Sequence, residues 1–116
     1  MLNINTVNTI LYCKRWEETV TFYKTGLKLQ STFSNDWFVE FKLNDAARLS
    51  IANEARASID SSQGKGITIS MAVDDIKATH AYLVRSGLEP TAIKELWGSK
   101  VIYLYDPEGN RLEFWS

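Results

Sequence analysis

Hydrophobic and polar residues alternate in several short stretches of this chain, and two other stretches follow a helical period. The run VNTILYC, residues 7–13, is rich in β-branched and large apolar residues and predicts a strand. The next stretch carries apolar side chains at Trp16, Val20 and Tyr23, which predicts an amphipathic helix ended by Gly26. Three alternating stretches follow this helix, so the first half is predicted to run strand, helix and three strands.

The second half of the chain repeats this order. Asp74 or Asp75 can cap a helix that Gly87 ends. The apolar residues expected on one side of this helix are Ile76, Ala78, Tyr82 and Leu83. The segment Asp106–Asn110 predicts a turn into the last strand, because proline fixes φ and Gly or Asn accepts a positive φ.

The two halves can be overlaid along their length. Residues from Asn8 onward match residues from Thr68 onward at a shift of sixty, with one extra residue placed before Gly87 in the second half. ARLSIA, residues 47–52, overlays NRLEFW, residues 110–115, at a shift of sixty-three. We therefore predict one α+β domain, residues 1–116, made of two tandem βαβββ modules. Their expected limits are about 1–55 and 66–116, with a polar, glycine-bearing linker at about 56–65.

Strand alternation assigns the side chains to two faces. One face is almost entirely apolar and suits a surface covered by helices: Leu11, Cys13, Leu49, Ile51, Ile67, Ile69, Met71, Val73, Ile102, Leu104, Leu112 and Phe114. The other face mixes aromatic rings with hydroxyls and charges. Its candidate ligand-binding residues are Asn8, Tyr12, Phe38, Glu40, Arg48, Ser50, Thr68, Tyr103, Arg111 and Trp115, beside Glu113 as a candidate catalytic residue. This mixture favours a ligand cleft, although the aromatic residues could instead seal a dimer interface.

Composition and charge restrict the range of functions. The chain has 116 residues, a size that suits one globular domain with its own core. Thirteen basic and fourteen acidic residues give a net charge of −1 without a run of like charges, which argues against nucleic-acid and anionic-membrane partners. No signal segment or run of about 20 apolar residues is recognisable, so we predict a cytoplasmic protein. Cys13, the single cysteine, is expected to be a buried structural thiol.

Several sequence motifs resemble those of the vicinal oxygen chelate superfamily. They are FYKTGLKL after the first helix, AVDDI at the opening of the second half, and DPEGNRLEFW at the end, within the paired βαβββ plan. The superfamily includes glyoxalases, bleomycin-resistance proteins and extradiol dioxygenases, and the resemblance covers essentially the whole chain. It implies curled mixed sheets that form a U-shaped cleft, often within a dimer.

Most of the usual metal ligands of the superfamily are missing from this sequence. Metal enzymes of the superfamily use up to four positions, which the resemblance carries onto Asn8, Ser50, Thr68 and Glu113. Only Glu113 is a normal ligand for a transition metal, and the single histidine, His80, lies on a predicted helix. Glu40 is the one nearby carboxylate that could add a ligand. We therefore expect no bound metal and no other cofactor.

Three roles for Glu113 follow from its position on the mixed face. It could pair with Arg48 or Arg111, anchor a ligand amine or hydroxyl, or remove a proton from a carbon acid as a general base. The preferred function is a metal-free homodimer that sequesters or senses a small aromatic or cationic molecule. The alternatives are a glyoxalase-like lyase, isomerase or dioxygenase with an atypical metal site or Glu113 as base, and a purely structural dimer. Trp97 could lie on a lid or cover the core.

Overall fold

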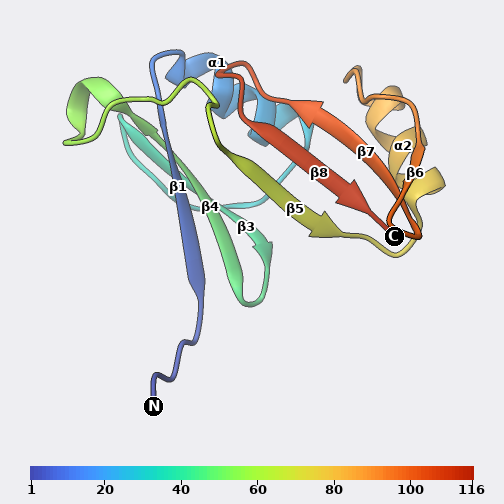
Figure 1. Cartoon of the computed structure of the whole chain (residues 1–116). Coiled ribbons are helices and arrows are strands. Elements are labelled where there is room, and N and C mark those ends of the chain that lie inside the picture. The colour runs from blue at the N-terminus through green and yellow to red at the C-terminus, as the bar shows by residue number, and fades with distance from the viewer. The chain divides into compact units, whose positions relative to one another are not determined.

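The computed structural model describes all residues, 1–116, and divides them into two compact units, residues 1–63 and 64–116. Each unit contains one four-stranded mixed sheet and one helical segment between its first two strands, and the first unit has a further short helix after its last strand (Figure 1). Each unit also follows the order strand, helix and three strands. The α+β class and the two tandem βαβββ modules are therefore confirmed.

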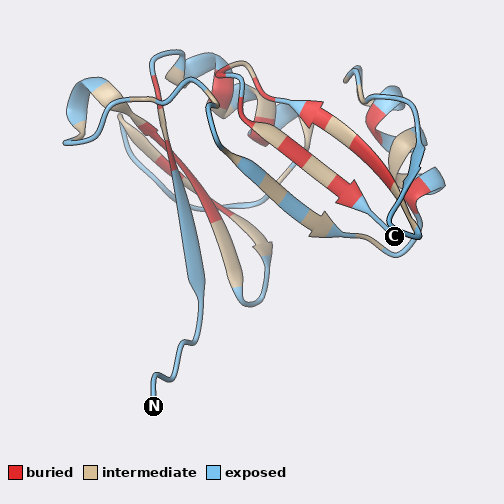
Figure 2. Cartoon of the chain, viewed as in Figure 1, coloured by how far each residue is buried: buried red, intermediate tan, exposed pale blue.

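The sheet of the first unit has the strand order β1-β4-β3-β2. β1 runs parallel to β4, and the other neighbouring strands are antiparallel. Residues 1–6 precede β1 as an exposed arm (Figure 2). The elements of this unit are β1 (Val7–Cys13), α1 (Trp16–Thr21), the π-helix η1 (Phe22–Gly26), β2 (Ser31–Ser34), β3 (Phe38–Asn44), β4 (Ala47–Asn53) and the short 3₁₀ helix η2 (Glu54–Arg56).

The second unit repeats this sheet with the order β5-β8-β7-β6 and a parallel pair, β5 and β8. Its elements are β5 (Thr68–Ala72), α2 (Ile76–Arg85), β6 (Lys94–Leu96), β7 (Ser99–Tyr105) and β8 (Arg111–Trp115). The side chain of Asp75 caps α2 by accepting hydrogen bonds from the backbone N–H groups of Lys77 and Ala78. No helix of the chain has the length and apolar character needed to cross a membrane.

Strand pairing confirms the overlay of the two modules. Ser50 on β4 pairs with Ile10 on β1, and Glu113 on β8 pairs with Ser70 on β5. The first strands are thus related by a shift of sixty, and the last strands by a shift of sixty-three. The module repeat extends to the register of the strands, so equivalent residues of the two units occupy equivalent places in their sheets.

The end of the first helix differs from the prediction. The helical segment does end at Gly26, but Gly26 is the last residue of its π-helical turn and not a glycine just past the helix, and the residue with positive φ is Lys28, at 59°. The N–H of Leu29 then donates to the carbonyl of Tyr23 across this widened turn. A π turn holds one residue more than an α turn, so it absorbs an insertion without changing the start of the helix.

The second helix ends at Gly87, as predicted. Gly87 has φ 81°, and the N–H of Leu88 donates to the carbonyl of Leu83 in the pattern of a Schellman motif. The equivalent positive-φ residues, Lys28 and Gly87, are fifty-nine apart, whereas the buried residues Tyr23 and Leu83 are sixty apart. The extra residue therefore lies in the first helix, and its predicted place before Gly87 is wrong.

The helices cover the apolar faces of the sheets in part, because the predicted apolar residues on and beside β5, which are Ile67, Ile69, Met71 and Val73, are only half-buried. α1 packs against β1 and β4, and α2 packs against β7 and β8. The fully buried positions of these faces include Leu11, Cys13, Leu49, Ile51, Ile102, Leu104 and Leu112, and buried segments follow β4, β7 and β8 in Figure 2. On α2 the prediction is only partly right, because Ile76 and Leu83 are buried whereas Ala78 and Tyr82 are exposed. The helical repeat instead turns Thr79 and His80 inward.

The predicted turn before β8 is present and is held by a buried aspartate. Oδ1 of Asp106 accepts hydrogen bonds from the backbone N–H groups of Glu108 and Asn110, at 3.0 and 2.9 Å. Its Oδ2 accepts from the side-chain amide of Asn110 at 2.9 Å. The backbone of Gly64 approaches this turn so closely that an added Cβ would lie 2.0 Å from the carbonyl oxygen of Gly109. The turn thereby fixes the start of the second unit.

Candidate functional site

A hollow of about 330 Å³ opens on the mixed face of the second sheet. All four strands of the unit and the turn between β6 and β7 contribute to it. Its lining residues are Ser70, Leu96, Trp97, Ser99, Val101, Glu113 and Trp115. Strand register explains this set, since Glu113 lies opposite Ser70, and Val101 lies opposite Trp115.

Glu113 supplies the only ionisable side chain that lines the hollow. It is half-buried on β8 between Leu112 and Phe114, whose side chains point to the other face and are buried. The hydroxyl of Ser70 donates a hydrogen bond to Oε1 of Glu113. The other carboxylate oxygen, Oε2, has no hydrogen-bond partner, so it can accept one from a ligand.

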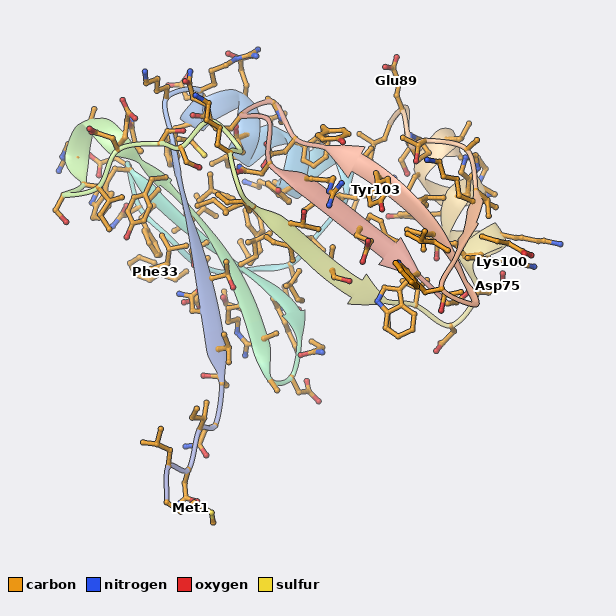
Figure 3. All side chains as sticks on the ribbon, viewed as in Figure 1. Met1, Phe33, Asp75, Glu89, Lys100 and Tyr103 are labelled. Atoms are coloured by element: carbon orange, nitrogen blue, oxygen red, sulfur yellow. The ribbon has the colours of Figure 1, made fainter.

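Arg111 lies two residues before Glu113 on the same face of β8 but has other partners. Its Nε donates to the hydroxyl of Thr68 at 2.9 Å, and its guanidinium carbon lies 4.4 Å from the ring centroid of Tyr103. Figure 3 shows Tyr103 on β7. The ion pair with Arg111, one of the alternatives considered for Glu113, is therefore not formed. A cation–π contact and a hydrogen bond hold the arginine instead.

Trp97 stands at the edge of the hollow in a two-residue turn. Leu96 and Ser99 are paired, so Trp97 and Gly98 alone connect β6 to β7. Both have positive φ, at 56° and 79°, as in the type I′ turns of tight hairpins. Trp97 is 94% exposed. The interpretation that Trp97 covers the core is therefore wrong, and its indole is available to a ligand.

The equivalent face of the first unit carries a closed polar network. The hydroxyl of Ser50 donates to Oδ1 of Asn8 at 2.7 Å, and Nδ2 of Asn8 donates to Oε2 of Glu40 at 3.4 Å. Oε1 of Glu40 accepts from the hydroxyl of Thr32 at 2.8 Å. Both carboxylate oxygens of Glu40 thus have donors inside the unit, in contrast to Glu113.

The remaining candidates of the first unit lie on its sheet, outside this network. Phe38 packs against the rings of Phe33 and Trp37, with centroid distances of 6.2 and 5.5 Å. Arg48 donates to two backbone carbonyls of the β3–β4 turn. Tyr12 is half-buried near the end of β1.

The structure thus brings only part of the predicted set into the hollow. Among the candidate residues, Glu113 and Trp115 line it, whereas Thr68, Tyr103 and Arg111 lie beside it on the same sheet. Leu96 was missed because its strand, β6, has three residues and is too short to show alternation, and Ser99 was missed because it is the first residue of β7, directly after the turn. The sequence signal that could have revealed these residues is Trp97-Gly98 between two extended stretches, since glycine in a two-residue connection is typical of a β-hairpin.

Comparison with known proteins identifies the family. The sequence model of the Glyoxalase/Bleomycin resistance protein/Dioxygenase superfamily matches residues 3–114. The chain belongs to this superfamily. No curated protein matches the sequence.

Solved structures of the superfamily share the fold of this chain at low sequence identity. A glyoxalase/bleomycin resistance protein/dioxygenase from Nocardioides is 17% identical, with a TM-score of 0.81 over 99% of this chain and 83% of that one. Lactoylglutathione lyase from Agrobacterium tumefaciens is 16% identical, with a TM-score of 0.78 over 99% and 95%. The bleomycin-binding protein from Streptomyces verticillus, complexed with copper(II)-bleomycin, is 21% identical, with a TM-score of 0.75 over 98% and 97%.

The residues at the superfamily's metal positions do not fit a transition metal. Asn8 and Ser50 are hydrogen-bonded to each other, and Thr68 accepts from Arg111, which leaves Glu113 as the single ordinary ligand. Amide and hydroxyl oxygens bind zinc, iron or nickel weakly. No group of three or more His, Cys, Asp or Glu side chains in the chain could hold a metal ion. No catalytic step can be assigned to a metal at these positions.

Proposed function

We propose that this protein is a metal-free binding protein for a small molecule, which it sequesters or senses as a cytoplasmic homodimer. The observation that carries the proposal is the hollow of the second unit, in which two tryptophans and two aliphatic side chains surround one carboxylate. Ligand sites in proteins combine apolar walls with a few directed polar groups in this way. Ser70 orients the carboxylate, and the free Oε2 is the directed acceptor.

The polar groups of the hollow favour binding over catalysis. A general base that removes a proton from a carbon acid needs a partner that stabilises the developing oxyanion. Apart from Glu113, the polar side chains that line the hollow are the hydroxyls of Ser70 and Ser99 and the indoles of Trp97 and Trp115. The free Oε2 of Glu113 is the one feature that favours the alternative, a glyoxalase-like lyase, isomerase or dioxygenase with Glu113 as base.

The similarity to a bleomycin-binding protein supports the proposal at the level of the fold. That protein binds its ligand with the same architecture, which shows that the fold can serve a binding function. At 21% identity the similarity does not carry the ligand over to this chain. The chemistry of the ligand therefore has to be inferred from the side chains that line the hollow.

A thermal-shift screen followed by calorimetric titration tests the proposal. A ligand at 100 times its Kd should stabilise the protein by about 2.7 kcal/mol, and this raises the melting temperature. For a ligand found in this way, Glu113→Gln should weaken binding at least about tenfold, because it removes a charge-assisted hydrogen bond. The matched control is Glu89→Gln, in the exposed loop after α2 (Figure 3). A broad screen without any stabilising molecule would contradict the proposal and favour a purely structural dimer.

Metal content and oligomeric state test the two finer parts of the proposal. Protein purified without chelators should contain far less than one equivalent of transition metal. Stoichiometric metal that is lost in Glu113→Gln would instead support the enzyme alternative.

Light scattering should give a mass of twice the 13.2 kDa of one chain, and a monomer at all concentrations would refute the homodimer.

A further inference from the structure

The charge of the hollow limits which ligands it can hold. Glu113 is its only ionisable lining residue, and the other six are serine, aliphatic or tryptophan side chains. A half-buried carboxylate with one unpartnered oxygen favours a ligand that brings a positive charge, because the ion pair offsets the loss of hydration. An anionic ligand would meet this carboxylate without any cation in the lining.

The basic side chains nearest to Glu113 in the sheet do not pair with its free carboxylate oxygen, Oε2. Arg111 is held by the ring of Tyr103 and the hydroxyl of Thr68. Lys94 is paired with Val101 and shares the same face, but its side chain is exposed and does not line the hollow. The carboxylate is therefore open to a cation from outside the unit.

Trp97 occupies a position that its side chain disfavours. Two-residue hairpin turns prefer Asn-Gly or Asp-Gly, because both central residues need positive φ, and a bulky residue with φ 56° is uncommon. The indole does not compensate by packing, because the residue is 94% exposed. Strained positions that gain nothing from the fold are concentrated at ligand sites. Trp97 also lines the hollow that contains Glu113.

We propose, on the basis of the binding function above, that the ligand is a flat monocation. Its positive group binds Oε2 of Glu113, and its ring packs on the indole of Trp97. Both parts of this ligand suit the site, since indoles attract cations and stack on planar rings. Trp97 is then the residue that selects planar ligands, and Glu113 is the residue that selects positive charge.

Three probes with one ring system and different charges test the role of Glu113. They are 1-naphthylmethylammonium, 1-naphthalenemethanol and 1-naphthoate, titrated by calorimetry into the full-length protein. The ammonium should bind at least about tenfold more tightly than the alcohol, and the naphthoate most weakly. In Glu113→Gln the ammonium should lose this advantage while the alcohol keeps its affinity.

The possible failures of this experiment separate the two proposals. If the alcohol or the naphthoate binds as tightly as the ammonium, the binding function stands and the cationic ligand is refuted. If none of the three probes binds up to millimolar concentration, the flat monocation is refuted, whereas the binding function fails only if the broad thermal-shift screen also finds no stabilising molecule.

Two substitutions test the role of Trp97. Trp97→Asn should raise the melting temperature, because asparagine suits the positive φ, and should weaken ammonium binding at least about tenfold. Trp97→Phe keeps a ring and should retain most of the affinity without the gain in melting temperature. Unchanged ammonium binding in Trp97→Asn would refute the stacking role even if the charge preference holds.

Discussion

A carboxylate between two buried apolar residues is explained by strand geometry. Leu112 and Phe114 point to the helix-covered face of the second sheet, and Glu113 points to the opposite face. The charge therefore does not enter the core. Ser70, its neighbour on β5, donates to one of its oxygens, and the remaining oxygen gives the hollow its chemical character.

Gly64 is the residue whose substitution the local geometry forbids most clearly. Its φ is 81°, and a Cβ would lie 2.0 Å from the carbonyl oxygen of Gly109, so Gly64→Ala must displace the turn before β8. Gly66→Ala is a matched control, because Gly66 has φ 74° but no atom within 4 Å of an added Cβ. We expect about 1–2 kcal/mol of destabilisation for Gly66→Ala from its φ alone, and clearly more for Gly64→Ala. Urea unfolding would measure both, and equal losses would contradict the close approach.

The two helices show how equivalent elements can end differently. In the first unit a π turn adds a residue and leaves Lys28 in the left-handed conformation. In the second unit no residue is added, and Gly87 takes that conformation at little steric cost. The sequence similarity of Gly26-Leu27 to Gly87-Leu88 therefore does not correspond to equivalent positions in the structure.

Alanine at the two aligned glycines, Gly26 and Gly87, should affect stability differently. Gly87→Ala should destabilise the protein by about 1–2 kcal/mol, because alanine disfavours φ 81°. Gly26→Ala should leave stability unchanged or raise it by up to about 1 kcal/mol, because Gly26 lies within a helical turn and alanine is the better helix former. Thermal and urea unfolding would measure the difference. A loss at Gly26 as large as that at Gly87 would mean that Gly26 also adopts a positive φ.

Across the whole chain, two units with one plan carry different chemistry on equivalent faces. Ser50 of the first unit corresponds to Glu113 of the second, and Glu40 corresponds to Tyr103. Asn8 and Thr32 satisfy both oxygens of Glu40. The first face is therefore a self-contained polar network, whereas the second is open to a ligand.

The cores of the two units should be equally sensitive to cavities at equivalent positions. Leu49 and Leu112 are sixty-three residues apart and are 1% and 0% exposed. We expect Leu49→Ala and Leu112→Ala each to cost about 2–5 kcal/mol of unfolding free energy. Val84→Ala on α2, where the residue is 52% exposed, should change stability by less than about 0.5 kcal/mol. Chemical denaturation would measure all three variants, and a small loss at only one leucine would indicate that its site relaxes to fill the cavity.

Most of the fold was predictable because its signals are local and occur twice. The alternation in β4 and β8, the aspartate cap of α2 and the turn at Asp106 depend on residues close in sequence. The π turn was not predictable in this way. The π turn adds one residue while Tyr23 stays buried and the indole of Trp16 keeps its hydrogen bond to the carbonyl of Ile51 on β4. Its position is therefore decided by tertiary packing and not by local sequence.

From the sequence, only the face of the sheets that carries the site could be predicted, and not which of its side chains meet. Alternation alone placed Glu113, Trp115 and the other mixed residues on the side away from the helices. Period-two patterns cannot say which of those side chains converge, because convergence depends on strand order, register and turn conformation. The pairing of β5 with β8 joined Ser70 to Glu113, and the type I′ turn brought Trp97 to the hollow. The local sequence thus fixes which residues share a surface, and long-range strand pairing determines which of them can bind one ligand together.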